Sequence, residues 1–188
     1  MLWLGALGIG VVAGFAARGS MDNLARLQFR WPWLVIAALA VREAAVLTPL
    51  NRVEGVEYVY LAALAALVAW TLWHIDRIAG IWLVTAGGLL NLVVIAANGG
   101  RMPVSPELAG ALVRSGHLGQ YTLMTSNTHL NWLADWIVLP GPLGRMLPEA
   151  YSPGDLIVAI GIGVVVVLAM RSRIGSGETR PRIVIDPP

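Results

Sequence analysis

The chain has 188 residues, of which 57% are hydrophobic and only 13% are charged. A water-soluble domain carries roughly a quarter charged residues, so this composition argues against an ordinary water-facing surface. The absence of cysteine excludes disulfides, thiolate nucleophiles and cysteine-ligated metal sites. The basic residues are all arginine, which excludes a Schiff-base lysine. The formal charge of only +2 does not favour a nucleic-acid partner.

Several apolar segments are about as long as a bilayer-spanning helix, which rises roughly 1.5 Å per residue. They cover residues 2–17, 33–48, 56–73, 78–97 and 155–170. The first of them lacks the basic n-region of a cleaved signal peptide, so we interpret it as a span. We therefore predict an all-α fold, a transmembrane bundle of five spans that forms one membrane domain over residues 1–170. The Gly-, Ser-, Arg- and Pro-containing residues 171–188 are predicted to form a disordered cytoplasmic tail.

The distribution of arginines predicts the orientation in the membrane. Cytoplasmic segments of membrane proteins carry an excess of basic residues. One predicted side carries Arg18, Arg26, Arg30, Arg77, Arg171, Arg173, Arg180 and Arg182, and the other carries Arg52, Arg101, Arg114 and Arg145. The N-terminus and the partly helical loop 98–154 are therefore expected outside, and the tail in the cytoplasm.

Small residues recur four positions apart in three spans. Ala6, Gly10 and Gly14 do so in the first, Ala62 and Ala66 in the third, and Ala159 and Gly163 in the fifth. Such spacing lets helix backbones approach closely in lipid. We interpret these faces as packing within one chain, with a homo-oligomer interface as the alternative.

The loop 98–154 is long enough to have structure of its own. The pair Gly99-Gly100 is typical of a helix end, and Ser105-Pro106-Glu107 of a helix start, in a helix that should run to about Arg114. Spaced apolar residues in 127–137 predict an amphipathic helix on the outer surface. The prolines that follow should break any helix, and Ser152 with Asp155 predicts a capping box. Those prolines are Pro140, Pro142 and Pro148.

Three stretches of this loop carry a family resemblance. Asn-Gly-Gly-Arg-Met-Pro-Val-Ser at 98–105, Leu-Asn-Trp-Leu-Ala-Asp at 130–135 and Ser-Pro-Gly-Asp at 152–155 resemble a bacterial family of small polytopic membrane proteins of unknown function. The resemblance covers most of residues 1–170 and excludes the tail. It implies a multi-span fold in a bacterial inner membrane. It implies no activity, so no catalytic residue is carried over from it.

Arg42 and Glu43 lie inside the second span, where isolated charges cost several kcal/mol. Neighbouring helical residues do not face each other, so we expect each to have a partner on another helix. Arg42 and Asn91 both lie six residues from the outer end of a span, roughly 9 Å deep. We predict a polar layer of Arg42, Glu43 and Asn91, with Asn98 and Arg101 just above it. This layer either binds a ligand, such as a lipid phosphate, or only holds the helices together.

Other polar residues give weaker signals. His117, His129 and Asp135 lie in the outer loop, but without the short spacing of metal ligands, and whether they converge is left open. The sequence predicts neither a metal nor a cofactor, since it has no phosphate loop, no dinucleotide fingerprint and no zincin motif. His74, with Asp76 and Arg77, is expected in a solvated turn.

Three hypotheses follow, and the sequence leaves open whether the protein is an enzyme. The first is a non-enzymatic module that binds a membrane lipid or a partner protein at the outer leaflet. The second is an enzyme that acts on a lipid-linked phosphate substrate, with Arg42 and Arg101 on the phosphate and Glu43, His117 or Asp135 as acid or base. The third is a small transporter, which the lack of an inverted repeat disfavours.

Overall fold

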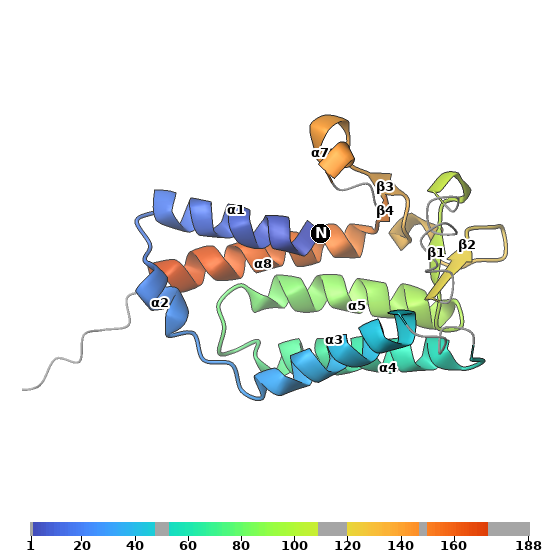
Figure 1. Cartoon of the computed structure of the whole chain (residues 1–188), viewed down its shortest axis with the longest axis horizontal. Helices are drawn as coiled ribbons and strands as arrows, with labels where there is room; N and C mark the ends of the chain where they lie inside the picture. Colours follow the sequence, from blue (N-terminus) through green and yellow to red (C-terminus); the bar gives the residue numbers. More distant parts are fainter. Residues whose placement is uncertain (1, 48–52, 109–119, 147–149, 173–188) are drawn as a thin grey trace, which may run out of the picture.

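The computed structural model describes residues 2–47, 53–108, 120–146 and 150–172, and it is mostly helical (Figure 1). Within these residues two helices, α4 and α8, are long and apolar enough to cross a membrane, and α1 and α5 are apolar but shorter. The helices are α1 (Leu2–Ala16), α2 (Met21–Ala25), α3 (Pro32–Leu47), α4 (Val56–Trp73), α5 (Ile81–Ala97), α7 (Gly141–Met146) and α8 (Pro153–Arg171). The short elements are β1 (Met102–Val104), β2 (Tyr121–Leu123), the 3₁₀ turn η3 (Asn131–Leu133), β3 (Ile137–Val138) and β4 (Ala150–Tyr151).

The five predicted apolar segments are all helical, and the bounds of four of them agree with the prediction to within two residues. The helix α5 begins at Ile81 instead of the predicted residue 78. Gly80 precedes it with a φ of 87°, and Arg77 and Ile78 donate their backbone N–H groups to the carbonyl of His74. Residues 74–80 therefore form a turn. The predicted tail lies outside the described residues from residue 173 onward.

The long helices lie side by side in the order α1, α8, α5, α4, α3, and successive helices along the chain run in opposite directions (Figure 1). One end of this bundle, here called the α2 end, carries α2 and the turn 74–80. The other end, here called the loop end, carries the described residues between α5 and α8. The helix α8 packs against α1, α2 and α5.

Glycines on α8 set its close contacts with both neighbours. A Cβ added at Gly161 would lie 2.7 Å from the backbone nitrogen of Val84 on α5. A Cβ added at Gly10 of α1 would lie 3.0 Å from the Cα of Gly163. The glycine face of α1 therefore packs within the chain, as the spacing of its small residues predicted.

The segment at the loop end is folded onto α5 by a buried apolar cluster. This cluster consists of Val94, Met102, Leu133 and Ala134. The helix α5 ends at the Gly99-Gly100 pair, whose φ angles are 65° and 87°, as the sequence predicted. Beyond it β1 pairs in parallel with β2, and β3 pairs antiparallel with β4. These strand pairs are an addition to the predicted all-α fold.

The prediction of an amphipathic helix over residues 127–137 is wrong. In its place the chain forms a turn, the single 3₁₀ turn η3 and then β3. Thr128 Oγ1 and Asn131 Nδ2 both donate to the carbonyl of Thr125, at 2.8 and 3.0 Å, and Leu130 has a φ of 57°. Such side-chain bonds to the backbone compete with a helix.

Two other predictions for the loop end concern a helix after Ser105 and the effect of Pro142. The helix predicted to start after Ser105 does begin at Pro106, and its predicted end near Arg114 lies outside the described residues. The expectation that Pro142 would break any helix is wrong, because Pro142 is the second residue of α7. A proline costs no hydrogen bond in the first turn of a helix.

Candidate functional site

Asn91 of α5 is bound to the first turn of α8. Its Nδ2 donates to Asp155 Oδ1 at 2.8 Å, and its Oδ1 accepts from Ser152 Oγ at 2.8 Å. Ser152 and Asp155 form the predicted capping box of α8. A Cβ at Gly154 would collide with Asn91 Oδ1, so only glycine leaves room for this amide. Asn91 therefore joins two helices at the loop end.

Arg42 and Glu43 of α3 pair with each other, with 2.8 Å between Arg42 Nη1 and Glu43 Oε1. The expectation that adjacent residues would seek separate partners is therefore wrong, because the long arginine side chain can fold back to its neighbour. Their side chains are 37% and 50% exposed. Arg42 is also within electrostatic reach of Tyr60 on α4 and of Asp155 on α8. Asn91 contacts neither Arg42 nor Glu43: its amide binds Asp155 and Ser152, whereas the two charged residues bind each other.

Asn98 and Arg101 tie the segment 98–154 to the helices. Asn98 Nδ2 donates to the carbonyl oxygens of Val94 and His129, at 2.8 and 2.9 Å. Its Oδ1 accepts from the His129 backbone N–H at 2.8 Å. Arg101 Nη2 lies 3.6 Å from Glu57 Oε1 at the start of α4. Both residues therefore have partners within the chain.

Asp135 is a buried acid at the centre of the segment 98–154. Its residue is only 5% exposed, and its Oδ1 has no hydrogen-bond partner among the described residues. Burial raises the pKa of Asp135 well above its usual range, and the nearby charge of Asp155 adds to this rise. The backbone N–H of Asp135 donates to the carbonyl of Pro103 in β1, and its carbonyl accepts from the N–H of Ser105 directly after β1, each at 3.0 Å.

The residues considered for a metal site do not form one where the structure describes them. His129 is exposed and is held through its backbone, while Asp135 is buried. His117 lies outside the described residues. Among the residues that are described, no three His, Asp or Glu side chains are placed to hold a metal ion.

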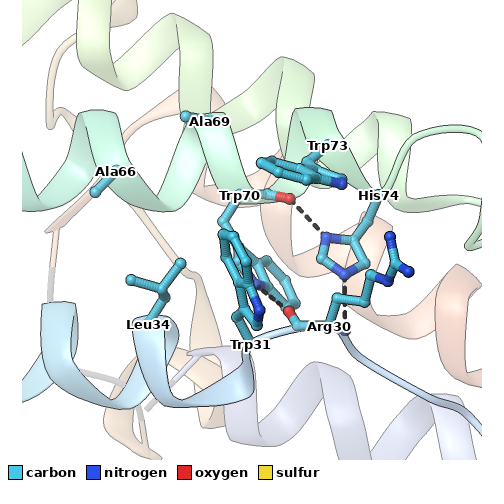
Figure 2. A pocket seen from close by; sticks show the side chains of 8 residues that line it. All are labelled: Arg30, Trp31, Leu34, Ala66, Ala69, Trp70, Trp73 and His74. Carbon is cyan, nitrogen blue, oxygen red and sulfur yellow. Dashed lines mark hydrogen bonds between the residues drawn. The ribbon is translucent and has the colours of Figure 1, made fainter.

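A cavity of about 520 Å³ lies between α3 and α4 at the α2 end, and Figure 2 shows it from close by. We refer to it as the α3–α4 groove. Sequence analysis missed it and expected His74 in a solvated turn, whereas His74 is only 1% exposed. The groove is lined by Arg30, Trp31, Leu34, Ala66, Ala69, Trp70, Trp73 and His74.

His74 connects the chain before α3 to the end of α4. Its Nε2 accepts from the Arg30 backbone N–H at 3.0 Å, and its Nδ1 lies 2.8 Å from the Trp70 carbonyl (Figure 2). Since Nε2 is an acceptor, the proton is on Nδ1, which donates to Trp70, and the ring is neutral. Trp70 Nε1 in turn donates to the Arg30 carbonyl at 2.9 Å. The backbone of Arg30 is therefore fixed on both sides.

Contacts between aromatic rings complete this end of the groove. The Trp70 ring lies 5.6 Å from Phe29 and 4.2 Å from His74, and the Trp31 ring lies 5.2 Å from Trp73, between centroids. Trp31 has a φ of 53°, which is rare for a bulky residue and turns the chain into α3. The sequence did contain a signal for this contact, since aromatic residues concentrate at 29–33 and 70–74, which the arginine count places on one side.

A model of a family of unknown function, DUF5317, matches residues 26–167, which is more than half of the chain. The chain belongs to this family. The DUF5317 match includes both the Asn91 contact with α8 and the α3–α4 groove, and it agrees with the expected resemblance to a family of unknown function. No curated protein and no solved structure matches the chain. The function must therefore be inferred from the molecule itself.

Proposed function

We propose that this chain is a five-span membrane protein and a non-enzymatic module that binds lipid at the outer leaflet. Large apolar side chains are exposed on every long helix. Monomeric water-soluble proteins rarely expose so much contiguous apolar surface, whereas hydrocarbon solvates it. Examples are Leu7 and Val12 on α1, Ile36 and Leu39 on α3, Val59 and Leu72 on α4, Leu89 and Val93 on α5, and Ile160 and Leu168 on α8.

The alternating helix directions support five crossings, with the loop end outside and the α2 end in the cytoplasm (Figure 1). The α2 end collects most of the arginines in the described part of the chain, which is the distribution that the positive-inside rule requires of cytoplasmic segments. These arginines are Arg18, Arg26, Arg30, Arg77 and Arg171.

The observation that carries the binding role is a pair of exposed tryptophans on a fixed support. Trp132 and Trp136 are 67% and 50% exposed, and Trp136 Nε1 donates to the Trp132 carbonyl at 3.0 Å. The hydrogen bonds of Asn98 and the β-bridge of Asp135 hold the chain on either side. Tryptophan favours the interface between lipid and water, so this pair is suited to contact head groups or a protein partner seated there.

In this proposal the predicted site residues hold the structure together and do not contact the ligand. Asn91, Asn98 and Arg101 fix the segment 98–154 to the helices, and Arg42 with Glu43 contributes a neutral ion pair near Asp155. The polar groups of these residues already have partners within the chain, so the ligand contact is assigned to the tryptophans.

Single cysteines test the membrane placement, because the natural chain has none. Ser126 at the loop end and Asp76 at the α2 end are both exposed. In intact cells, a membrane-impermeant maleimide should label the Ser126→Cys variant. It should label the Asp76→Cys variant only after the membrane is permeabilised. Labelling of both variants in intact cells, or of the second alone, contradicts the placement.

Fluorescence quenching tests the lipid contact. The protein is reconstituted in vesicles whose lipids carry bromine either near the head group or deep in the chains. The Trp132→Phe/Trp136→Phe variant should lose a component of emission that head-group-proximal bromine quenches and deep bromine spares. If the variant and the natural chain lose the same fraction of emission in both vesicles, the tryptophans do not contact lipid.

A further inference from the structure

We propose that the α3–α4 groove binds one anionic lipid, with the phosphate on the Arg30 guanidinium and the first part of an acyl chain between α3 and α4. This site is at the α2 end, opposite the tryptophan pair of the proposed function. The inference rests on the proposed membrane placement, which also assigns the lipid to the cytoplasmic leaflet.

The shape of the groove favours an apolar chain. Ala66 and Ala69 on α4 and Leu34 on α3 line the groove, and the small side chains of the alanines leave the space open (Figure 2). From Ala66 to Trp73 the groove follows α4 for seven residues, or about 10 Å. Its lining side chains are apolar or aromatic except for Arg30 and His74. Both ring nitrogens of His74 and the indole N–H of Trp70 are already hydrogen-bonded within the described residues, so away from Trp31 and Trp73 at its mouth the wall of the groove is apolar.

The charge at its mouth favours an anion. The Arg30 guanidinium has no ion-pair or hydrogen-bond partner among the described residues, and no lining residue is acidic. The backbone of Arg30 is fixed by His74 and Trp70, so its side chain extends from a fixed point at the edge of the groove. Arginine matches the geometry of a phosphate with two parallel hydrogen bonds.

The tryptophans at the mouth indicate the depth. Trp31 and Trp73 are each 54% exposed beside Arg30, and such rings favour the boundary between head groups and hydrocarbon. A lipid with its phosphate at Arg30 has its chains at the level of Ala69 and Ala66. A helix from a second copy would also fit small residues, but it would leave the Arg30 cation without a partner.

Native mass spectrometry of the full chain in detergent tests the site. The probes are phosphatidylglycerol, which is anionic, and phosphatidylcholine, which is zwitterionic, with matched chains. The natural chain should retain one phosphatidylglycerol about tenfold better than phosphatidylcholine. The Arg30→Gln variant should lose this preference, whereas Arg26→Gln should keep most of it. Arg26 is the matched control, since it is exposed at the same end and does not line the groove.

A second variant separates the groove from its charge. Ala69→Leu should reduce retention of both lipids by about tenfold, because the larger side chain fills the space of the acyl chain. Inorganic phosphate should not displace the lipid, because it lacks the acyl chain that occupies the groove.

Several results would overturn the proposal. They are equal retention of the two lipids by the natural chain, a preference that survives Arg30→Gln, and an equal loss in Arg26→Gln. Displacement by phosphate would show a simple anion site, and a dimer that Ala69→Leu converts to a monomer would assign the groove to a second copy. None of these results depends on Trp132 and Trp136, so the proposed function fails or stands separately.

Discussion

The two helix interfaces of α8 and the interface of α3 with α4 differ in how closely the backbones approach. On α8, glycines bring the helices so close that an added Cβ would meet backbone atoms, as at Gly161 and Gly10. Between α3 and α4, the alanines Ala66 and Ala69 instead face a cavity of about 520 Å³. The same class of small residue therefore closes one interface and leaves the other open.

The closely packed interfaces of α8 form the rigid part of the molecule, and the interface between α3 and α4 is the part that has space for a ligand. The α8 interfaces are also fixed by polar contacts at both ends, through Asn91 at the loop end and through Asn23, whose Nδ2 donates to the Met170 carbonyl at 2.8 Å. The helix α3 packs closely on α4 alone among its neighbours. The aromatic contacts at the α2 end hold this pair together and leave the groove unfilled.

The largest expected effect comes from adding one methyl group to the closed interface. Gly161→Ala should destabilise the protein by about 1–3 kcal/mol, because the methyl meets the backbone nitrogen of Val84 and one helix must move. Gly8→Ala on α1 is the matched control, since a Cβ there has nothing within 4 Å. Thermal unfolding in detergent measures both. Equal melting temperatures for the two variants would show that the glycine contact on α8 is not close.

A comparable effect is expected from the loss of the polar contact between α5 and α8. Asn91→Ala should cost about 1–3 kcal/mol, because it leaves Ser152 Oγ and Asp155 Oδ1 without the amide. The control Asn127→Ala lies in an exposed turn and should change stability by less than about 0.5 kcal/mol. Denaturant unfolding followed by tryptophan fluorescence gives both values. A cost for Asn91→Ala no larger than that of the control would rule out the proposed anchoring role.

The helices on both sides of this comparison could be predicted from the sequence, because long apolar runs and capping residues act locally. The match of the 56–73 prediction to α4 and the capping box of Ser152 with Asp155 are examples. A depth argument also predicted that Asn91 belongs to a polar layer. It placed Arg42 in the same layer, although the amide binds Asp155 and Ser152 and the ion pair forms between adjacent residues.

What the sequence could not predict depends on long-range contacts and on rare backbone conformations. The α3–α4 groove requires the positive φ of Trp31 and the hydrogen bonds that bury His74 between Arg30 and Trp70. The loop end requires the positive φ of Leu130, which replaces the expected helix by a turn. Apolar spacing carries no information on either angle.

Asp135 is a buried acid that belongs to neither of these interfaces. Because the pKa of Asp135 is raised in the folded state, its protonated form is favoured by folding. The stability that Asp135 contributes should be fully present below the ordinary carboxyl pKa of about 3.9 and should be lost as the pH rises through the raised pKa. The slope is at most about 1.4 kcal/mol per pH unit. Unfolding measured across this range, with the Asp135→Asn variant alongside, gives the dependence.

The Asp135→Asn variant should lose the slope and gain stability at the upper end of the range, because its side chain carries no charge. Asp22→Asn at the exposed start of α2 is the control and should leave the slope unchanged. An equal slope in the natural chain and in Asp135→Asn would mean that Asp155 or another carboxyl carries the dependence. The loop end would then be independent of the charge on Asp135.

The smallest expected effect is the one that tests the open interface. Ala66→Leu adds three carbons where Gly161→Ala adds one, yet it should change the melting temperature very little, because the side chain enters the α3–α4 groove. Ala63→Leu on the same helix is the matched control. Ala63 is buried, so overpacking there should cost about 1–3 kcal/mol. If both leucines cost the same, the space between α3 and α4 is closed in solution, and the difference between the two interfaces disappears.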